Sequence, residues 1–207
     1  MAELIPVRRY VDADNSCLFS SIAYLTDANY SEMSKYKYRQ MIAETLFNDS
    51  SKYSDAFLGK NKFEYMEFIQ DSSNWGGEIE NKIFSDIFKV EVASIHIQDL
   101  KMNIYGSDMG YQYRIYMLYN GIHYDPIVMT PDLKLDSSCD IKMFNNNDNE
   151  VKTKFIDLAK TFQNQNDFVD LSNIPTLKCS DCEKVFSNQN KAAEHAQNVG
   201  HWNFEQI

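Results

Sequence analysis

The stretch YRIYMLYNGIHYDPIVM, residues 113–129, decides how we expect this chain to fold. Two runs rich in β-branched and aromatic residues flank the pair Asn120-Gly121, which is typical of a type I′ turn, so the stretch predicts a β-hairpin. Residues 4–11 and 89–97 also have the composition of strands.

Apolar residues at helical spacing dominate the segment before this β-rich part. Ser16 is the expected N-cap of the first helix. The predicted helices lie at 17–25, 31–49, 61–70 and 78–88, with Met33, Met41, Ile42 and Leu46 of the second one facing the core. Because helices come first and strands mostly later, the sequence predicts an α+β domain, with helices packed on a small sheet that the N-terminal strand can join.

Composition limits the class of protein. The chain has 207 residues, 43% of them hydrophobic, which suffices for one domain of ordinary size and a small appendage. No run approaches the roughly 18 apolar residues of a membrane helix, and the first residues lack a signal-peptide core, so we expect an intracellular protein without membrane insertion. The net charge of −10 makes nucleic acid an unfavourable partner and suits a basic protein or peptide.

The C-terminal region has the ligand types and spacing of a tetrahedral structural zinc site, namely Cys179-x2-Cys182-x12-His195-x5-His201. A knuckle would supply two thiolates and a helix ending near Gly200 would supply His195, while four unrelated cysteines and histidines are the alternative. Phe186 is expected to fill the small core beside the metal, and metal binding is expected to be coupled to folding.

A DNA-reading finger is the less favoured interpretation of this region. The base-contacting positions would be Asn188, Lys191 and Glu194, and Ala192 stands where such fingers usually carry leucine. There is one finger and no basic cluster, so we expect a protein-interaction or stabilising module.

The candidate general base is His123, in the strand that leaves the hairpin turn. Side chains alternate along a strand, so His123 and Asp125 share a face, with Cα atoms about 6.5–7 Å apart. A carboxylate at that distance can orient an imidazole, as a thiol-imidazole-acid triad requires. A hydrogen-bonded histidine without catalytic function is the alternative, and it is our interpretation of His96.

The candidate nucleophile is Cys17, in the stretch VDADNSCLFSSI, residues 11–22. At the first turn of a helix, backbone N–H groups and the helix dipole favour a thiolate. The preceding turn and the Cys17 amide could form an oxyanion hole, with Asp14 shaping the turn. A buried structural cysteine and a simple turn aspartate are the alternatives.

Three segments together resemble the ovarian-tumour (OTU) family of cysteine proteases. DADNSCLFSSI is similar to the family's nucleophile segment, and YNGIHYDP is similar to its histidine strand. YSDAFLGKNKFEYMEFIQDSSNWGGEIE and the C-terminal HAQNVGHWNF are similar to one subfamily that carries a Cys2His2 finger. The resemblance covers about residues 5–204 and implies a papain-like protease domain of α+β class, with a small ββα zinc finger.

The resemblance also implies site residues. Cys17 would be the nucleophile, His123 the general base, Asp125 the residue that orients it, and Asp14 the motif acid of the nucleophile loop. Two loops would flank the channel for the Gly-Gly tail of ubiquitin: Val11, Asp12, Ala13, Asn15 and Ser16 in one, and Tyr119, Asn120, Gly121 and Ile122 in the other. The corresponding parts are a catalytic domain at 5–129, a polar loop, amphipathic helix and linker at 130–173, and a zinc finger at 174–207.

The implied function is thiol-dependent removal of ubiquitin from polyubiquitin or ubiquitinated proteins, in the cytoplasm with the nucleus as an additional location. Structural zinc in the finger would be the only cofactor, with none needed for catalysis. The acidic charge fits the arginine-bearing tail of ubiquitin. Alternatives are an inactive ubiquitin-binding adaptor, or a cysteine hydrolase acting on another ubiquitin-like modifier.

The subfamily also implies a pathway. Full-length members carry an N-terminal UBX-L domain that docks on an AAA ATPase, which extracts ubiquitinated proteins, including those of the endoplasmic reticulum. No such domain precedes residue 5 in this sequence, so we expect the ATPase as a partner only of a longer form, while quality control and endoplasmic-reticulum-associated degradation stay the expected pathway.

Overall fold

The computed structural model describes residues 4–49, 52–170, 177–186, 191, 195–196, 198–201 and 203–206. The chain forms two compact units, Met1–Phe168 and Val169–Ile207. The first unit therefore includes the amphipathic helix that the sequence analysis placed outside the domain at 5–129. The three predicted domain boundaries stay predictions, and the boundary between 173 and 174 lies outside the described residues.

One mixed sheet forms the centre of the first unit, with the strand order β1-β5-β4-β2-β3, and β6 pairs with β4. The β2–β4 pair is parallel, and the other pairs are antiparallel. The strands are β1 Ile5–Arg8, β2 Glu91–His96, β3 Met102–Tyr105, β4 Tyr113–Tyr119, β5 Tyr124–Thr130 and β6 Phe144–Asn145.

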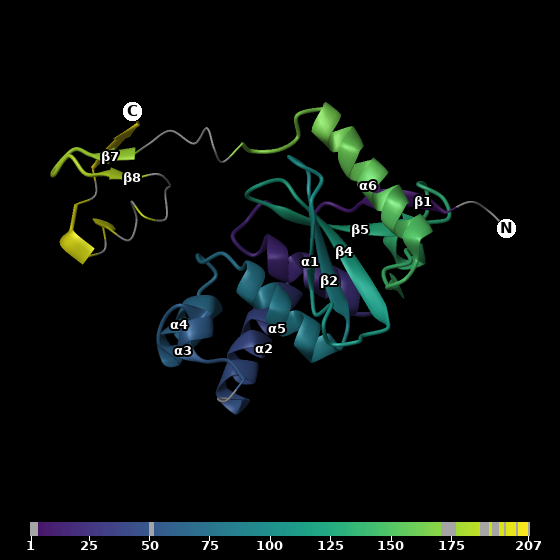
Figure 1. The fold of residues 1–207 in the computed structure, drawn as a ribbon, viewed down its shortest axis with the longest axis horizontal. Coiled ribbons are helices and arrows are strands. Elements are labelled where there is room, and N and C mark those ends of the chain that lie inside the picture. Colours follow the sequence, from purple (N-terminus) through teal and green to yellow (C-terminus); the bar gives the residue numbers. More distant parts are fainter. Residues whose placement is uncertain are drawn as a thin grey trace. The chain divides into compact units, whose positions relative to one another are not determined.

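Helices cover both faces of this sheet (Figure 1). Alternating side chains of β4 divide between the faces: Met117 packs with α1, α2 and α5, while Leu118 packs in the cluster that contains Phe155 of α6. The helices are α1 Cys17–Thr26, α2 Ser34–Asn48, α3 Asp55–Leu58, α4 Lys62–Gln70, α5 Glu78–Phe88 and α6 Asn149–Asn164, with a short 3-10 helix at Ser137–Cys139. The α+β class predicted from the order of elements is confirmed.

The hairpin at residues 113–129 is present, but its turn differs from the expected one. Four residues, 120–123, separate β4 from β5, and the Asn120 amide donates to the carbonyl of His123 at 3.1 Å. The His123 amide donates to the side chain of Asn120 at 2.8 Å. In a regular two-residue turn between these residues, this amide would donate to the backbone carbonyl of Asn120 instead. Of the Asn120-Gly121 pair, only Gly121 has a positive φ, 106°, whereas a type I′ turn needs two.

One detail of the predicted helices is confirmed and one is wrong. Ser16 stands at the N-cap of α1 as predicted, although its side chain makes no capping bond and accepts hydrogen bonds from the Arg39 guanidinium instead. Met33 precedes α2 and is 68% exposed, because the helix begins at Ser34 and not at Ser31. Ile42 and Leu46 are buried as predicted, and Met41 is half-buried against the same core.

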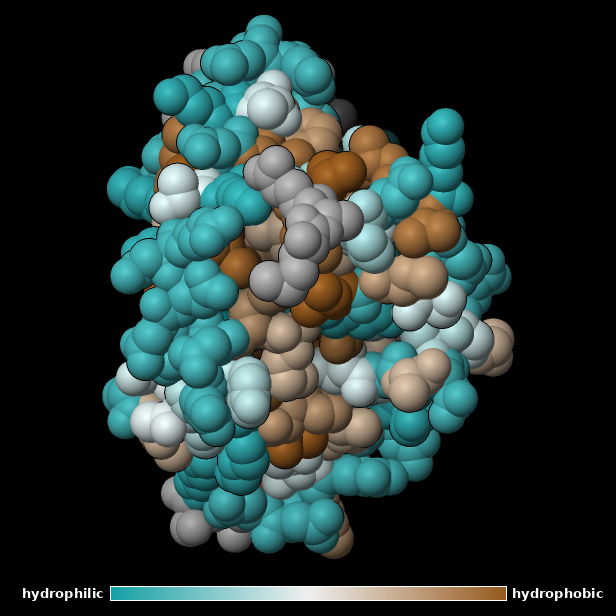
Figure 2. All heavy atoms as spheres, turned by 90° about the vertical axis from the view of Figure 1, so that its right-hand side faces the viewer, coloured by the Kyte–Doolittle hydropathy of each residue, from teal (hydrophilic) through white to brown (hydrophobic). Residues whose placement is uncertain are grey.

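Figure 2 faces the side of the first unit on which β1 and α6 lie, and hydrophobic residues gather there among hydrophilic ones. A shallow groove of about 560 Å³ runs between these two elements and includes Leu4, Pro6 and Leu158. Within the described ranges, no helix is long and apolar enough to cross a membrane.

The second unit contains a three-stranded sheet of order β8-β7-β9, with β7 Leu177–Cys179, β8 Val185–Phe186 and β9 Phe204–Gln206. Strand β9 was not predicted, because its three residues are too few to show a periodicity. His195 and Ala196 have helical backbone, and the Gly200 amide donates to the carbonyl of Ala196 with φ at 75°, so the helix ends there as predicted. Three positions discussed for DNA reading, 188, 192 and 194, lie outside the described residues.

Candidate active site

Cys17 is the first residue of α1 and is 8% exposed. The next turns of the helix anchor it, because Leu18, Phe19 and Ile22 are buried in the core beneath the sheet. The thiol therefore sits at the N-terminal end of a rigid helix, where backbone N–H groups and the helix dipole favour a negative charge.

His123 lies in the hairpin loop, one residue before β5, and its ring lies between Cys17 and Asp125. Its Nε2 is 3.1 Å from Oδ1 of Asp125. The Cys17 thiol interacts with the same ring and contributes to its raised pKa. Residues more than a hundred positions apart thus meet in one thiol-imidazole-carboxylate chain. This is the geometry in which a base takes a proton from a thiol while an acid holds the base in place.

Asp125 is 1% exposed and makes three hydrogen bonds, so its carboxylate is fixed on both sides. Oδ1 accepts the Val11 amide at 2.9 Å and lies 3.1 Å from Nε2 of His123, while Oδ2 accepts Nε of Arg8 at 2.8 Å and forms an ion pair with its Nη2 at 2.7 Å. Burial alone would raise the pKa of Asp125, but the bonds from His123 and Val11 and the nearby Arg8 charge hold it below its usual range. The carboxylate is therefore ionised at neutral pH.

The charge distribution makes the His123 ring basic. A hydrogen bond to Asp125 and a second one to Cys17 raise the pKa of His123 to about 10, although burial lowers it. At neutral pH the ring carries both protons and can hold a thiolate as an ion pair.

Asp14 does not contact His123. Its Oδ1 accepts the Ser16 amide at 2.8 Å, and its Oδ2 pairs with the Lys35 ammonium at 2.7 Å. Partial burial would raise the pKa of Asp14, but the bonds from Lys35 and Ser16 keep it low. Asp14 therefore shapes the loop before Cys17.

Arg39 is the second residue that fixes this loop, and the sequence analysis missed it. It is 1% exposed, and its guanidinium donates to Ser16 Oγ and to the carbonyls of Asn15, Ile69 and Asn74. Its Cζ also lies 4.1 Å from the ring centre of Phe19. The buried Arg39 side chain thus links the nucleophile loop, through Asn15 and Ser16, to Asn74 in the segment after α4 by hydrogen bonds.

Among the amides predicted to form an oxyanion hole, those of Ser16 and Cys17 have partners inside the turn. The Ser16 amide donates to the Asp14 side chain, and the Cys17 amide makes a long bond of 3.3 Å to the Asp14 carbonyl. The Cys17 amide would have to give up this weak bond to stabilise an oxyanion, and catalytic hydrogen bonds commonly tighten only when substrate is bound.

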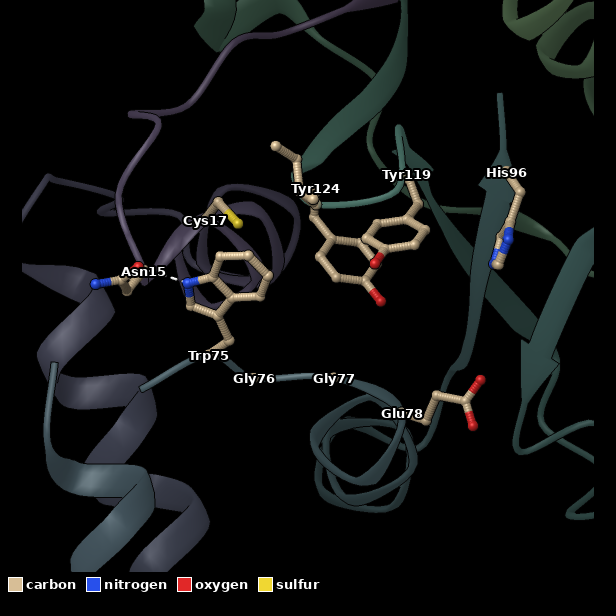
Figure 3. Close-up of a pocket in the computed structure, with 10 residues that line it drawn as sticks. Asn15, Cys17, Trp75, Gly76, Gly77, Glu78, His96, Tyr119 and Tyr124 are labelled. Atoms are coloured by element: carbon tan, nitrogen blue, oxygen red, sulfur yellow. Dashed lines mark hydrogen bonds between the residues drawn. The ribbon is translucent and has the colours of Figure 1, made fainter. Parts of the chain in front are cut away.

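A cavity of about 190 Å³ opens beside Cys17. Figure 3 shows Asn15 and Cys17 at one side of it, His96 at the other, and the rings of Trp75, Tyr119 and Tyr124 between them. Asn15, Tyr119 and Ile122 are the residues of the predicted tail channel that line it. Its other lining residues are Trp75, Gly76, Gly77, Glu78, His96 and Tyr124.

The remaining predicted channel residues lie around the cavity and do not line it. Asp12 and Ala13 are exposed, and Ser16 is buried behind the loop. The Val11 amide binds Asp125, and Asn120 and Gly121 build the hairpin loop, in which the Tyr119 hydroxyl donates to the Gly121 carbonyl.

The segment Trp75-Gly76-Gly77 forms one wall of the cavity and lies directly on α1. The indole N–H of Trp75 donates to the side chain of Asn15, and the Gly77 amide donates to buried Glu80 at 2.7 Å. A Cβ on Gly76 would come within 2.8 Å of Leu18 and 2.9 Å of Phe19, so only glycine fits this approach. The signal in the sequence is the pair of glycines after an aromatic residue, a pattern that by itself predicts only a turn.

The four predicted metal ligands converge in the second unit. One donor atom from each of Cys179, Cys182, His195 and His201 lies within 4.8 Å of all the others. Cys182 Sγ is 3.3 Å from Nε2 of His195, and Cys179 Sγ is 3.6 Å from Nδ1 of His201. Tetrahedral zinc with ordinary bond lengths separates such ligands by about 3.3–3.8 Å, so this donor set fits zinc. The Phe186 ring lies 4.8 Å from the His195 ring, as expected for the residue beside the metal.

Comparison of the sequence with protein families gives two matches. Residues 12–131 match the OTU-like cysteine protease family, and residues 175–207 match the C-terminal C2H2-type zinc finger of ubiquitin thioesterase OTU1.

Proteins of similar sequence include the ubiquitin thioesterase OTU1 of Xenopus laevis, 36% identical over 97% of this chain and 66% of the relative. The human protein of the same name is 34% identical over 99% of this chain and 59% of its own length. The chain thus spans less than two thirds of these relatives. The ovarian tumor domain-containing deubiquitinating enzyme 2 of Arabidopsis thaliana is 33% identical, with 99% of both chains covered.

Solved structures of similar fold include an OTU domain in complex with ubiquitin. It has a TM-score of 0.69 and 29% identity, and the match covers 81% of this chain and 92% of that one. The viral OTU domain protease from Taggert virus, at 21% identity, matches in fold with a TM-score of 0.51 over 60% of this chain and 80% of its own.

Proposed function

Because the chain belongs to the family of OTU-like cysteine proteases, we propose that it hydrolyses the isopeptide bond between the C-terminal glycine of ubiquitin and a lysine. The observation that carries this proposal is the contact of His123 with both Cys17 and Asp125, next to a cavity that Cys17 helps to line. The names of the relatives, and the related OTU domain in complex with ubiquitin, support ubiquitin as the substrate.

The chemistry follows from the three side chains. His123 holds the proton of the Cys17 thiol, and the thiolate attacks the carbonyl carbon of the terminal glycine. The tetrahedral intermediate collapses to a thioester as His123 gives its proton to the departing lysine amine. A water molecule then gives one proton to His123 and attacks the thioester. Collapse of this second intermediate expels the Cys17 thiolate, which takes the proton from His123 to restore the thiol, and the released carboxyl group of ubiquitin loses the other proton to solvent.

The cavity favours a slender substrate tail. Its volume of about 190 Å³ and its aromatic walls, Trp75, Tyr119 and Tyr124, suit two glycines in extended form. Glu78 in its lining and the net charge of −10 suit the basic residues that precede those glycines.

The test is reaction with ubiquitin that carries a C-terminal electrophile, followed by cleavage of a panel of differently linked di-ubiquitins. We expect the wild-type protein to be labelled at Cys17 and to cleave at least one linkage, and Cys17→Ala to do neither. Wild-type protein that is folded and binds zinc, yet is not labelled and cleaves nothing, would contradict the proposal.

Two other functions remain as outcomes of the same test. An inactive adaptor would bind ubiquitin without labelling, and a hydrolase of another modifier would cleave that modifier's fusion faster than a ubiquitin fusion. The intact triad favours an enzyme over the adaptor, because binding alone needs no activated thiol. Nucleic-acid binding would show a steep salt dependence, and we expect none at moderate salt.

We also propose that the second unit holds a structural zinc ion and that catalysis needs no metal, since the triad supplies nucleophile, base and acid. None of the four cysteines forms a disulfide in the structure, which suits the reducing cytoplasm and nucleus. A role in quality control and endoplasmic-reticulum-associated degradation, with an AAA ATPase as partner of a longer form, rests on the likeness to the longer relatives. Co-precipitation of the ATPase by a longer form, and its absence with these 207 residues, would support this role.

A further inference from the structure

We propose that Arg8 is a positioning residue of the active site: it holds the Asp125 carboxylate in the orientation that the His123 ring requires. The inference rests on the proposed hydrolase function, because it assigns a further residue to that same site.

The two oxygens of Asp125 are divided between their partners. Oδ2 accepts the hydrogen bond from Arg8 Nε at 2.8 Å and forms the ion pair with Arg8 Nη2 at 2.7 Å. Oδ1 is thereby directed at the Val11 amide and at Nε2 of His123. The carboxylate cannot rotate without losing the charge-assisted hydrogen bond from Nε and the ion pair with Nη2, so the position of Oδ1 depends on Arg8.

Arg8 is itself held in place. Its guanidinium carbon lies 4.7 Å from the ring centre of Tyr10 and 4.8 Å from that of Phe162, and its Nη1 donates to Asp167. Asn166, with a φ of 55°, follows the C-terminus of α6 and turns the chain so that the Asp167 amide donates to the Phe162 carbonyl. The end of α6 thus fixes Arg8 from the side opposite to Asp125.

Arg8 lies outside the substrate site. It does not line the cavity beside Cys17, and it reaches the thiol only through Asp125 and His123. The charged groups of this chain alternate in sign, in the order Asp167, Arg8, Asp125 and the His123 imidazolium. Loss of Arg8 should therefore reduce turnover and leave substrate affinity unchanged.

The experiment compares Arg8→Met with Arg9→Met. Arg9 is a matched control, because it also makes a two-bonded ion pair, at 2.8 and 2.7 Å, with a covered carboxylate, Asp140. For hydrolysis of a ubiquitin C-terminal fluorogenic amide, we expect Arg8→Met to lower kcat about 10- to 100-fold, part of the roughly 10⁴-fold loss seen when a triad acid no longer fixes the histidine. KM should change less than about twofold, and Arg9→Met should keep the wild-type kcat.

A double-mutant cycle separates positioning from general destabilisation. If Arg8 acts through Asp125, Arg8→Met added to Asp125→Asn should have no further effect on kcat. Arg8→Lys keeps the charge but not the paired donors, so its kcat should lie between those of wild type and Arg8→Met. Multiplicative losses in the cycle, or a wild-type kcat in Arg8→Met, would overturn the inference.

Two further measurements keep the test decisive. If Arg8→Met does not fold, as judged by circular dichroism, Arg8→Lys replaces it, and a wild-type kcat in that variant overturns the inference. Alkylation of Cys17 by iodoacetamide, followed by mass spectrometry of its peptide, needs no ubiquitin, and we expect it to be several-fold slower in Arg8→Met than in wild type. Equal alkylation rates overturn the inference, whereas failure of wild type to act on ubiquitin with slower alkylation of Arg8→Met overturns only the proposed function.

Discussion

The protonation of His123 affects both the catalytic proton transfers and the stability of the folded protein. Its pKa of about 10 comes from the bond to Asp125 first and from the bond to Cys17 second. When Cys17 becomes a thioester, the second contribution disappears, and the pKa of His123 falls. The ring can then accept a proton from the attacking water, so one side chain serves as acid in the first half of the reaction and as base in the second.

We predict that the stabilising effect of His123 depends on pH in a defined direction. Its pKa is raised in the folded protein from an ordinary 6.5 to about 10, so protonation favours the folded state. The difference in unfolding free energy between wild type and His123→Gln should be fully present at pH 6 and should shrink as the pH rises toward about 10. Urea unfolding at several pH values measures it.

Cys17→Ala is the control for that prediction. Without the thiol, one of the two causes of the raised pKa is gone, so the stabilisation by His123 should be lost at a lower pH than in wild type. A difference between wild type and His123→Gln that grows as the pH rises would contradict the assignment.

Individual residues differ in how far sequence could predict them. Cys17 was found through the start of a helix, and the contact of His123 with Asp125 follows from a spacing of two in the chain. Arg8 is 117 positions from Asp125, and Arg39 is 23 from Ser16, so no local pattern marks either contact. Both are surface-type residues whose burial depends on tertiary packing.

Among the elements, we expect the segment Trp75-Gly76-Gly77 to be the most sensitive to substitution, because it packs closely on α1. It lies on the first turn of α1 and is held at both ends, by the Arg39 bond to the Asn74 carbonyl and by the Glu80 bond to the Gly77 amide. Any displacement of this segment moves both the wall of the cavity and the helix that carries Cys17.

We predict that Gly76→Ala destabilises the first unit by about 1–3 kcal/mol, the usual cost of overfilling a packed site. The added Cβ would meet Leu18 at 2.8 Å, and Leu18 and Phe19 are too buried to move aside. Gly77→Ala is the control, because a Cβ there meets no atom within 4 Å. Thermal unfolding should show a lower midpoint for Gly76→Ala only, and equal midpoints in the two variants would refute the close-packing argument.

The sequence predicts whether a segment forms a helix or a strand better than it predicts the structure of the loops and the surface on which each helix packs. The strands and the long helices follow the periodicity of their apolar residues, whereas the four-residue loop at 120–123 depends on one side-chain hydrogen bond that the Asn-Gly pair does not reveal. Helix α6 was predicted as amphipathic, but its place in the first unit was missed, because its apolar stripe does not say which surface it covers.

At the scale of the whole molecule, the two units are expected to respond separately to metal removal. The described part of the second unit has three short strands, and the donor atoms of Cys179, Cys182, His195 and His201 lie close together there, so metal binding is expected to stabilise its fold.

We predict that a strong zinc chelator removes one ion per chain and makes the second unit sensitive to protease, while labelling of Cys17 by the ubiquitin electrophile continues. Zinc release is measured with a colorimetric indicator, and cleavage sites by mass spectrometry. Cys182→Ser should behave like the chelated protein, and Cys139→Ser, which changes an exposed thiol outside the cluster, should keep its zinc. Loss of Cys17 labelling on chelation would contradict independent units.

The position of Asp125 has a practical consequence for anyone who trims this protein. Cys17 begins a helix on one face of the sheet. Asp125 shares the opposite face with Ile127 and Met129, which are two and four residues further along β5, and α6 covers that face. The active site therefore depends on both faces of the sheet. The residues that support it from the α6 side are Arg8, Phe162 and Asp167, and they lie outside the stretch 12–131 that matches the protease family. A fragment cut to that stretch would retain every reactive group and lose the scaffold that aims them.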